Sequence, residues 1–201
     1  MTAEMTEQAA WDAHDRKDFR EAARIWESLI ASAASGTARD ALRSNYCYAL
    51  VGLQRFDEAR RIHQELYEKT GSHIDLHQLG MVAREAGEYD RALALFEEEH
   101  SMLQGGHPLA RAANLYERGL VQSLLGHREE ALQLAENCLA LSKKTDNPVM
   151  HGCAWRLLGD LYRSANPKHA RDHYVQARAA FAQADDHVAC ADIDSRMQSL
   201  I

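Results

Sequence analysis

The feature that most limits what this 201-residue chain can form is a small residue followed by an alanine about twelve positions later. The pair occurs five times, with four separations of 12 residues and one of 11. The pairs are Ala10 with Ala22, Cys47 with Ala59, Gly80 with Ala92, Gly119 with Ala131, and Gly159 with Ala170. Self-similarity of this kind indicates stacked units of secondary structure, because one such unit cannot bury its apolar face alone.

The residues around each alanine follow a helical spacing. Four residues after the alanines come Trp26, His63, Phe96, Ala135 and Tyr174. Three residues before them come Phe19, Phe56, Tyr89, Arg128 and Pro167. Positions three and four apart share one face of a helix, so we expect a buried helix face to begin at each alanine.

Three segments carry the pattern most clearly. They read LGMVAREAGEYDRALALF from Leu79, RGLVQSLLGHREEAL from Arg118, and LLGDLYRSANPKHARDHYVQA from Leu157. They resemble the tetratricopeptide repeat (TPR) family, in which each unit is a pair of antiparallel helices with small residues at the crossing. The steps between alanines are 37, 33, 39 and 39 residues, mostly above the usual period of about 34. This spacing is similar to the long repeats of kinesin light chains and of bacterial signalling-peptide receptors.

The resemblance implies an all-α fold, a right-handed superhelical solenoid of about five helix pairs. We expect one domain over residues 1–201, with repeats at about 5–35, 38–71, 73–104, 108–145 and 148–185. The last segment, 187–201, is expected to be a helix that caps the apolar end of the array. Half of a dimer interface is the alternative for this segment.

Composition favours a soluble helical protein, with 46% hydrophobic and 26% charged residues. No stretch reaches the roughly 20 apolar residues of a membrane helix, and Met1–Glu7 lacks the pattern of a secretory signal. The four cysteines have no CxxC spacing, which favours buried free thiols and a cytoplasmic location. A net charge of −7 without a basic cluster argues against nucleic acid as a partner.

Motifs of catalysis are missing from the sequence, which has no GxSxG, GxxxxGK[ST] or GxGxxG. We therefore predict a non-enzymatic protein without a cofactor. His73 and His77, like His169 and His173, stand four residues apart and could form half a zinc site. Since the sequence supplies no third ligand for either pair, we predict no metal site.

The resemblance also implies that the first helix of each pair lines a concave groove. The peptide-binding residues carried over from it are Trp11, Tyr48, His77, Met81, Arg84, Tyr116, Leu120, Arg156, Asp160 and Arg163. Aromatic residues and methionine supply adaptable apolar contacts, and arginine pairs with carboxylates. For Trp11 and Tyr48, packing against the neighbouring helix is an equal alternative.

These features predict a scaffold or adaptor that holds a protein or peptide segment, of acidic character, in the groove. One alternative is a sensor for a signalling peptide that acts through a separate output protein. Another is a self-association module that uses the C-terminal helix. The protein is expected to be a monomer or a weak homodimer, without a membrane partner.

Overall fold

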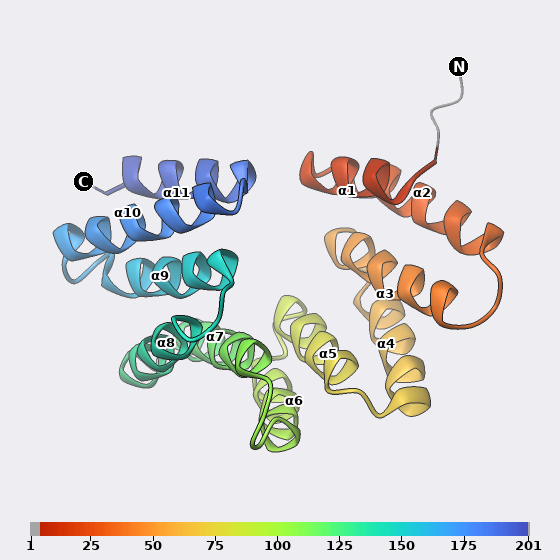
Figure 1. The fold of residues 1–201 in the computed structure, drawn as a ribbon, viewed down its shortest axis with the longest axis horizontal. Helices are drawn as coiled ribbons and strands as arrows, with labels where there is room; N and C mark the ends of the chain where they lie inside the picture. Colours follow the sequence, from red (N-terminus) through yellow and green to blue (C-terminus); the bar gives the residue numbers. More distant parts are fainter. Residues whose placement is uncertain (1–4, 201) are drawn as a thin grey trace. The chain divides into compact units, whose positions relative to one another are not determined.

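The computed structural model describes residues 5–200, and over this range the chain forms eleven helices and no strand (Figure 1). The helices are α1 (Glu7–Asp15), α2 (Phe19–Ser32), α3 (Thr37–Gly52), α4 (Phe56–Thr70), α5 (His73–Glu85), α6 (Tyr89–Met102), α7 (Pro108–Leu124), α8 (Arg128–Ser142), α9 (Pro148–Tyr162), α10 (Pro167–Gln183) and α11 (His187–Gln198). The prediction of an all-α solenoid is confirmed. Within the described range, no helix is long and apolar enough to cross a membrane.

The register of the helix pairs is the one that the alanines predict. Every second helix begins three residues before its alanine. All ten residues of the five pairs are buried, as are the five residues that lie four positions after the alanines. In the pairs α1/α2, α3/α4, α7/α8 and α9/α10 the two helices pack against each other, and the small residues that the sequence repeats are buried there.

Glycine is needed where the paired helices cross. A Cβ atom on Gly159 would lie 2.4 Å from the ring of Tyr174. On Gly119 it would lie 3.1 Å from Leu157 and 3.3 Å from Leu134. Because real Cβ atoms rarely approach other atoms so closely, a side chain at Gly119 would overpack the crossing, which typically costs about 1–3 kcal/mol.

The turns inside the first four pairs share one conformation. The residue two positions before the second helix has a positive φ in each case, with 61° at Lys17, 60° at Gln54, 77° at Gly87 and 82° at Gly126. Gly71 after α4 has the left-handed conformation expected of a helix cap, with φ 61°. In the fifth pair, the side chain of Asn166 caps α10 by accepting a bond from the backbone N–H of His169, as Asp18 does for α2 with Glu21.

The chain forms two compact units, and the boundary lies inside α6 between Leu95 and Phe96. We call them the N-terminal unit and the C-terminal unit. The first has one apolar core, built from α1 to α5. The second has two apolar clusters, one over α7 to α9 and one over α9 to α11. A single domain over 1–201 stays a prediction, and its residues 1–4 and 201 lie outside the described range.

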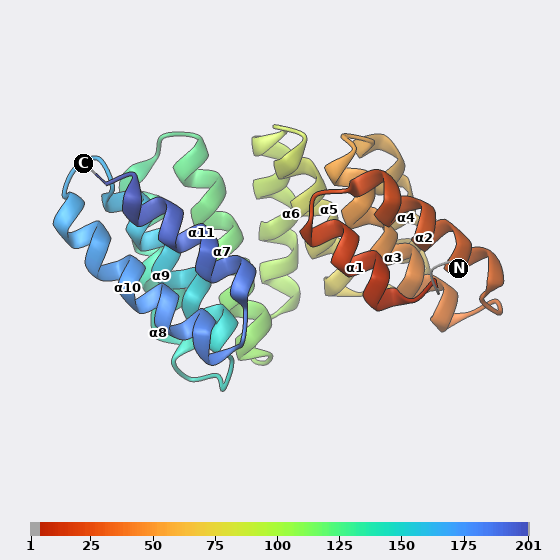
Figure 2. The ribbon, with the colours of Figure 1, turned by 90° about the horizontal axis from the view of Figure 1, so that it is seen from above.

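Helix α11 packs against α10, and Figure 2 shows the two side by side. Ile193 is fully buried in the cluster that contains Tyr174 and Phe181 of α10. This contact is the one expected of a helix that covers the end of a repeat array. Val188 of the same helix is 58% exposed.

Candidate functional site

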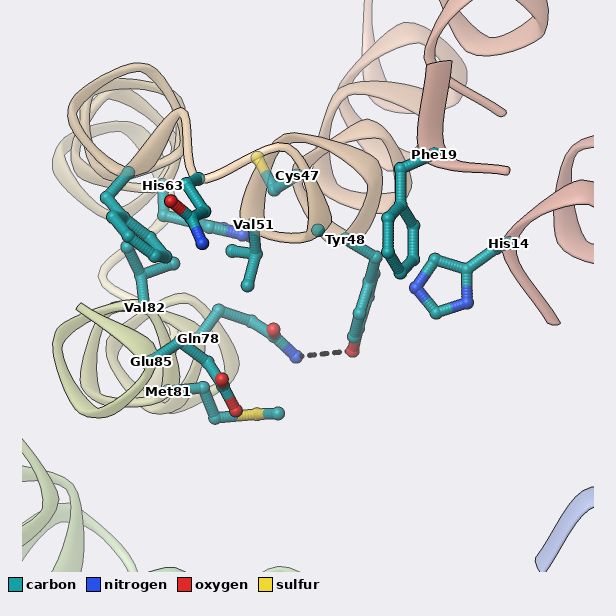
Figure 3. Close-up of a pocket in the computed structure, with 13 residues that line it drawn as sticks. His14, Phe19, Cys47, Tyr48, Val51, His63, Gln78, Met81, Val82 and Glu85 are labelled. Atoms are coloured by element: carbon teal, nitrogen blue, oxygen red, sulfur yellow. Dashed lines mark hydrogen bonds between the residues drawn. The ribbon is translucent and has the colours of Figure 1, made fainter. Parts of the chain in front are cut away.

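A pocket of about 470 Å³ opens in the N-terminal unit (Figure 3). Helices α1, α3 and α5, each the first of its pair, supply most of its lining, and α2, α4 and the turn before α4 supply the rest. The lining residues are His14, Phe19, Cys47, Tyr48, Val51, Gly52, Gln54, Phe56, His63, Gln78, Met81, Val82 and Glu85. Its size falls within the range of pockets that bind small ligands or single side chains.

Helical spacing explains which side chains reach the pocket. On α5, Gln78, Met81 and Glu85 are three and four residues apart and so lie on one face. On α3, Tyr48 and Val51 are three apart and project toward the same space. First helices with a shared orientation thus combine their inner faces into one lining.

A hydrogen bond joins two of these helices at the pocket. Gln78 donates from Nε2 to the hydroxyl oxygen of Tyr48 over 3.0 Å, which links α5 to α3 (Figure 3). The ring of Tyr48 also stands edge-on to Trp11, with centroids 5.4 Å apart. Trp11 makes a second edge contact at 5.4 Å with the buried Trp26. Tyr48 therefore lines the pocket, while Trp11 packs against the ring of Tyr48 without belonging to the lining.

The most buried side chains of the lining include Cys47, His63 and Val82. His63 is only 1% exposed, and neither of its ring nitrogens has a hydrogen-bond partner among the described residues. Nδ1 lies 3.8 Å from Oδ1 of Asp75, beyond hydrogen-bond distance. Burial lowers the pKa of His63 to about 4 even though Asp75 acts in the opposite direction, so the ring is neutral at pH 7.

The thiol of Cys47 is protonated at neutral pH. Its Sγ donates to the backbone oxygen of Arg43 over 3.3 Å. Burial raises the pKa of the thiol to about 12. Because the thiolate is the reactive form of cysteine, Cys47 does not supply a nucleophile at neutral pH.

Two of the residues carried over to α5 lie outside the pocket lining. The lining contains Gln78 and Glu85, each one position after the expected His77 and Arg84. Arg84 donates from Nη1 to Glu85 over 2.6 Å. Met81, between them, lies where it was expected. A peptide-binding role for His77 and Arg84 stays a prediction.

In the C-terminal unit the expected groove residues make contacts with other side chains of the protein. Arg156 donates from Nη2 to the hydroxyl oxygen of Tyr116 over 2.8 Å. Its Nη1 lies 3.6 Å from Oδ2 of Asp192 on α11, and its guanidinium stands 5.7 Å from the ring centroid of Phe181. Leu120 is half-buried against the cluster of α7 to α9.

Asp160 and Arg163 also form hydrogen bonds, with side chains of α10, of α11 and of the residue that follows α11. Asp160 accepts a bond of 2.6 Å from the hydroxyl of Tyr174 and one of 2.6 Å from Nη1 of Arg196. Arg163 donates from Nη2 to the hydroxyl of Ser199 over 2.8 Å. The inner side of α9 therefore faces protein side chains, and the sequence pattern alone did not reveal this.

One of the two histidine pairs belongs to an aromatic cluster. The rings of His169 and His173 lie 4.4 Å apart, and His173 stacks on Trp155 with centroids 5.3 Å apart. Tyr162 contacts His169 edge-on at 4.5 Å. Within residues 5–200, no group of three or more potential metal ligands gathers at this pair or at His73 and His77.

Comparison with known proteins places the fold. No protein-family model matches the sequence, and no curated protein matches it. Among solved structures, the chain is similar to PlcR of Bacillus thuringiensis, solved in complex with the peptide PapR7 and DNA. The TM-score is 0.76 and the identity 15%, over 93% of this chain and 72% of PlcR.

Two further structures agree. The TPR protein TTC0263 of Thermus thermophilus gives a TM-score of 0.69 at 19% identity, over 97% of this chain and 98% of that one. Kinesin light chain TPR-like repeats of Podosopora anserina give 0.59 at 18% identity, over 89% and 94%. Likeness at this level of identity identifies a fold. With the helix pairs, the buried small residues and the turns described above, the chain has the tetratricopeptide-repeat fold, similar to its long-repeat forms.

Proposed function

We propose that this protein is a non-enzymatic scaffold that binds a protein or peptide segment, and that the pocket of the N-terminal unit anchors one side chain of that segment. The observation that carries the proposal is the pocket itself, which the first helices of three consecutive pairs line with apolar and aromatic groups. A preformed pocket on rigid helices loses little entropy when it binds, so a few anchors suffice to hold an extended or helical segment.

The test begins with affinity capture of partners and mass spectrometry. Hydrogen exchange of the purified complex should show protection in α1, α3 and α5. Met81→Ala should weaken the complex about tenfold, because an anchoring contact removed from a binding pocket typically costs more than about 1 kcal/mol. Met102→Ala is the matched control, since Met102 is 44% exposed on α6 and does not line the pocket. Equal effects of the two variants would place the binding surface elsewhere.

The charge of the partner is a separate part of the proposal. The sequence predicts an acidic segment, yet the pocket lining contains the carboxylate of Glu85 and no lysine or arginine. Glu85→Gln separates the possibilities, because removing a negative charge strengthens binding of an acidic segment and weakens binding of a basic one. The salt dependence of the affinity should change in the same direction.

A signalling-peptide sensor is the second candidate, favoured by the similarity to PlcR, whose structure contains a bound peptide. The same structure also contains DNA, which is a ligand of PlcR. For this chain, a partner other than nucleic acid stays our prediction, based on its net charge of −7. If the protein is a sensor, a short free peptide should bind it as tightly as the whole partner from which the peptide is taken. If it is a scaffold, only the folded partner should bind tightly.

Self-association through α11 is the third candidate. The exposed Val188 gives this helix an apolar position that faces away from Ile193 and the buried cluster. Size-exclusion chromatography with light scattering distinguishes a dimer from the monomer. A dimer that Val188→Glu converts into a monomer would support this candidate over the scaffold.

A further inference from the structure

His63 is the one polar residue of the pocket that is almost completely buried, and it has no hydrogen-bond partner among the described residues. Buried polar atoms of native proteins are bonded in the large majority of cases, and an exception needs an explanation. Its repeat position, four residues after Ala59, holds the fully buried Phe96 in the next pair. Packing alone is therefore met by an apolar ring at this position, and the histidine nitrogens serve another purpose.

The nearby Asp75 favours one of the two tautomers of the His63 ring. Its Oδ1 lies 3.8 Å from Nδ1 of His63, and its Oδ2 accepts a bond of 2.9 Å from the hydroxyl of Thr70. A negative charge on this side favours the tautomer with the hydrogen on Nδ1. Nε2 is then left with a lone pair, as an acceptor without a donor.

The pocket around His63 does not provide that donor. Val51, Phe56 and Val82 are apolar, and the thiol of Cys47 already donates to a backbone oxygen. Gln78 directs one N–H of its Nε2 to Tyr48, and no donor of the lining is bonded to the ring of His63. An unpaired acceptor in apolar surroundings gains most from a ligand that brings an O–H or N–H group on an apolar body.

We propose that the pocket binds an aromatic side chain that carries a hydrogen-bond donor, as tyrosine does, with the donor bonded to Nε2 of His63. This inference rests on the proposed peptide-binding function and names its anchor. The aromatic body would contact Phe19, Tyr48 and Met81, since methionine sulfur and ring edges both pack well against aromatic faces. The hydroxyl would point toward His63, which belongs to the lining.

Two model compounds test the inference without knowledge of the partner. N-acetyl-tyrosinamide and N-acetyl-phenylalaninamide differ only in the hydroxyl group. We expect the wild-type protein, followed by two-dimensional NMR, to bind the tyrosine amide about tenfold more tightly, as one satisfied buried acceptor typically provides. Resonances of α3, α4 and α5 should shift, together with the ring nitrogens of His63.

Two variants separate the acceptor from the shape of the pocket. His63→Phe should fold, because Phe96 occupies the same repeat position in the next pair and is fully buried. It should bind both amides equally. His63→Gln keeps an acceptor and should retain part of the preference for the tyrosine amide.

Three results would overturn the inference. These are equal binding of the two amides by the wild-type protein, a preference that survives in His63→Phe, and no binding of either amide. Equal binding is also the result expected if a buried water bonds Nε2 permanently. Failure of the scaffold proposal is seen in a different measurement, when a captured partner protects only helices of this protein that do not line the pocket, and this result leaves the amide titration unaffected.

Discussion

Met81 and Asp160 occupy the same repeat position, one residue after a crossing glycine, but their surroundings are different. Met81 on α5 lines the open pocket of the N-terminal unit. Asp160 on α9 accepts hydrogen bonds from Tyr174 and from Arg196 of α11. The comparison shows that the inner face of α5 lines an open pocket, whereas the inner face of α9 is covered by side chains of α10 and α11.

The residues four positions after the alanines repeat this contrast. Tyr174, after Ala170, is fully buried and its hydroxyl donates to Asp160 over 2.6 Å. His63, after Ala59, is equally buried and its nitrogens have no hydrogen-bond partner in the described part of the chain. Tyr174 and His63 thus differ in that the first has a hydrogen-bond partner on the neighbouring helix and the second has none within residues 5–200.

Removing residues 187–201 tests whether α11 is what closes the second region. The deletion exposes the cluster around Phe181 and removes the fully buried Ile193, a loss that typically costs at least about 3 kcal/mol. For a protein of this size, we expect the melting temperature to fall by about 6–12 °C. Thermal unfolding followed by circular dichroism measures this, and binding at the pocket should not change.

The opposite outcome would reverse the interpretation of α11. If the melting temperature is unchanged while light scattering shows a dimer becoming a monomer, the helix is an interface. The difference between the two regions would then not come from capping.

Acid should affect the pocket region through His63. Its pKa is about 4 in the folded protein and 6.5 in the reference state, so the unfolded chain binds the proton more readily. The stability present above pH 6.5 is therefore lost as the pH falls toward 4, by about 3 kcal/mol at 1.36 kcal/mol per pH unit. Urea unfolding at pH 7.5 and pH 4 measures this loss of unfolding free energy in the wild type and in His63→Phe.

His63→Phe should lose less stability than the wild type over this interval, because the other titrating groups are common to both proteins. Parallel losses in the two proteins would contradict the idea that His63 is buried in its neutral form. Tyr174→Phe is a useful control, since it alters the equivalent site without removing a group that titrates in this range.

The smallest expected changes in unfolding free energy come from replacing Asp160 or Met81 by alanine. Asp160→Ala leaves the hydroxyl of Tyr174 without its acceptor and should cost about 1–3 kcal/mol of unfolding free energy. Met81→Ala only widens an open pocket and should stay below about 1 kcal/mol. Chemical denaturation measures both values. The reverse order would mean that Met81 is a core residue.

Local repetition made the helix register predictable. A small residue, an alanine and the bulky residues around it determine where a helix pair crosses, and the second helices begin at Phe56, Tyr89 and Arg128, each three residues before its alanine. These positions depend on neighbours within one pair, which a single sequence displays directly.

The surroundings of the inner face depend on more distant parts of the chain. The pocket takes Gln78 and Glu85 where His77 and Arg84 were expected, because one residue along a helix turns the side chain by about 100°. Arg156 lies close to Asp192, and Asp160 accepts a hydrogen bond from Arg196. Both partners come more than 30 residues later in the chain. Neither the rotation of α5 nor the contact with α11 has a local signal in the sequence.

The buried thiols give each unit its own reporter. Cys47 lies in the N-terminal unit and Cys138 in the C-terminal unit, both buried and each with its thiol pKa raised to about 12 by burial. Neither can react with a disulfide reagent until its surroundings open, so the labelling rate of each thiol measures the local opening of its own unit. Ligand that enters the pocket should slow the labelling of Cys47 and leave that of Cys138 as it was.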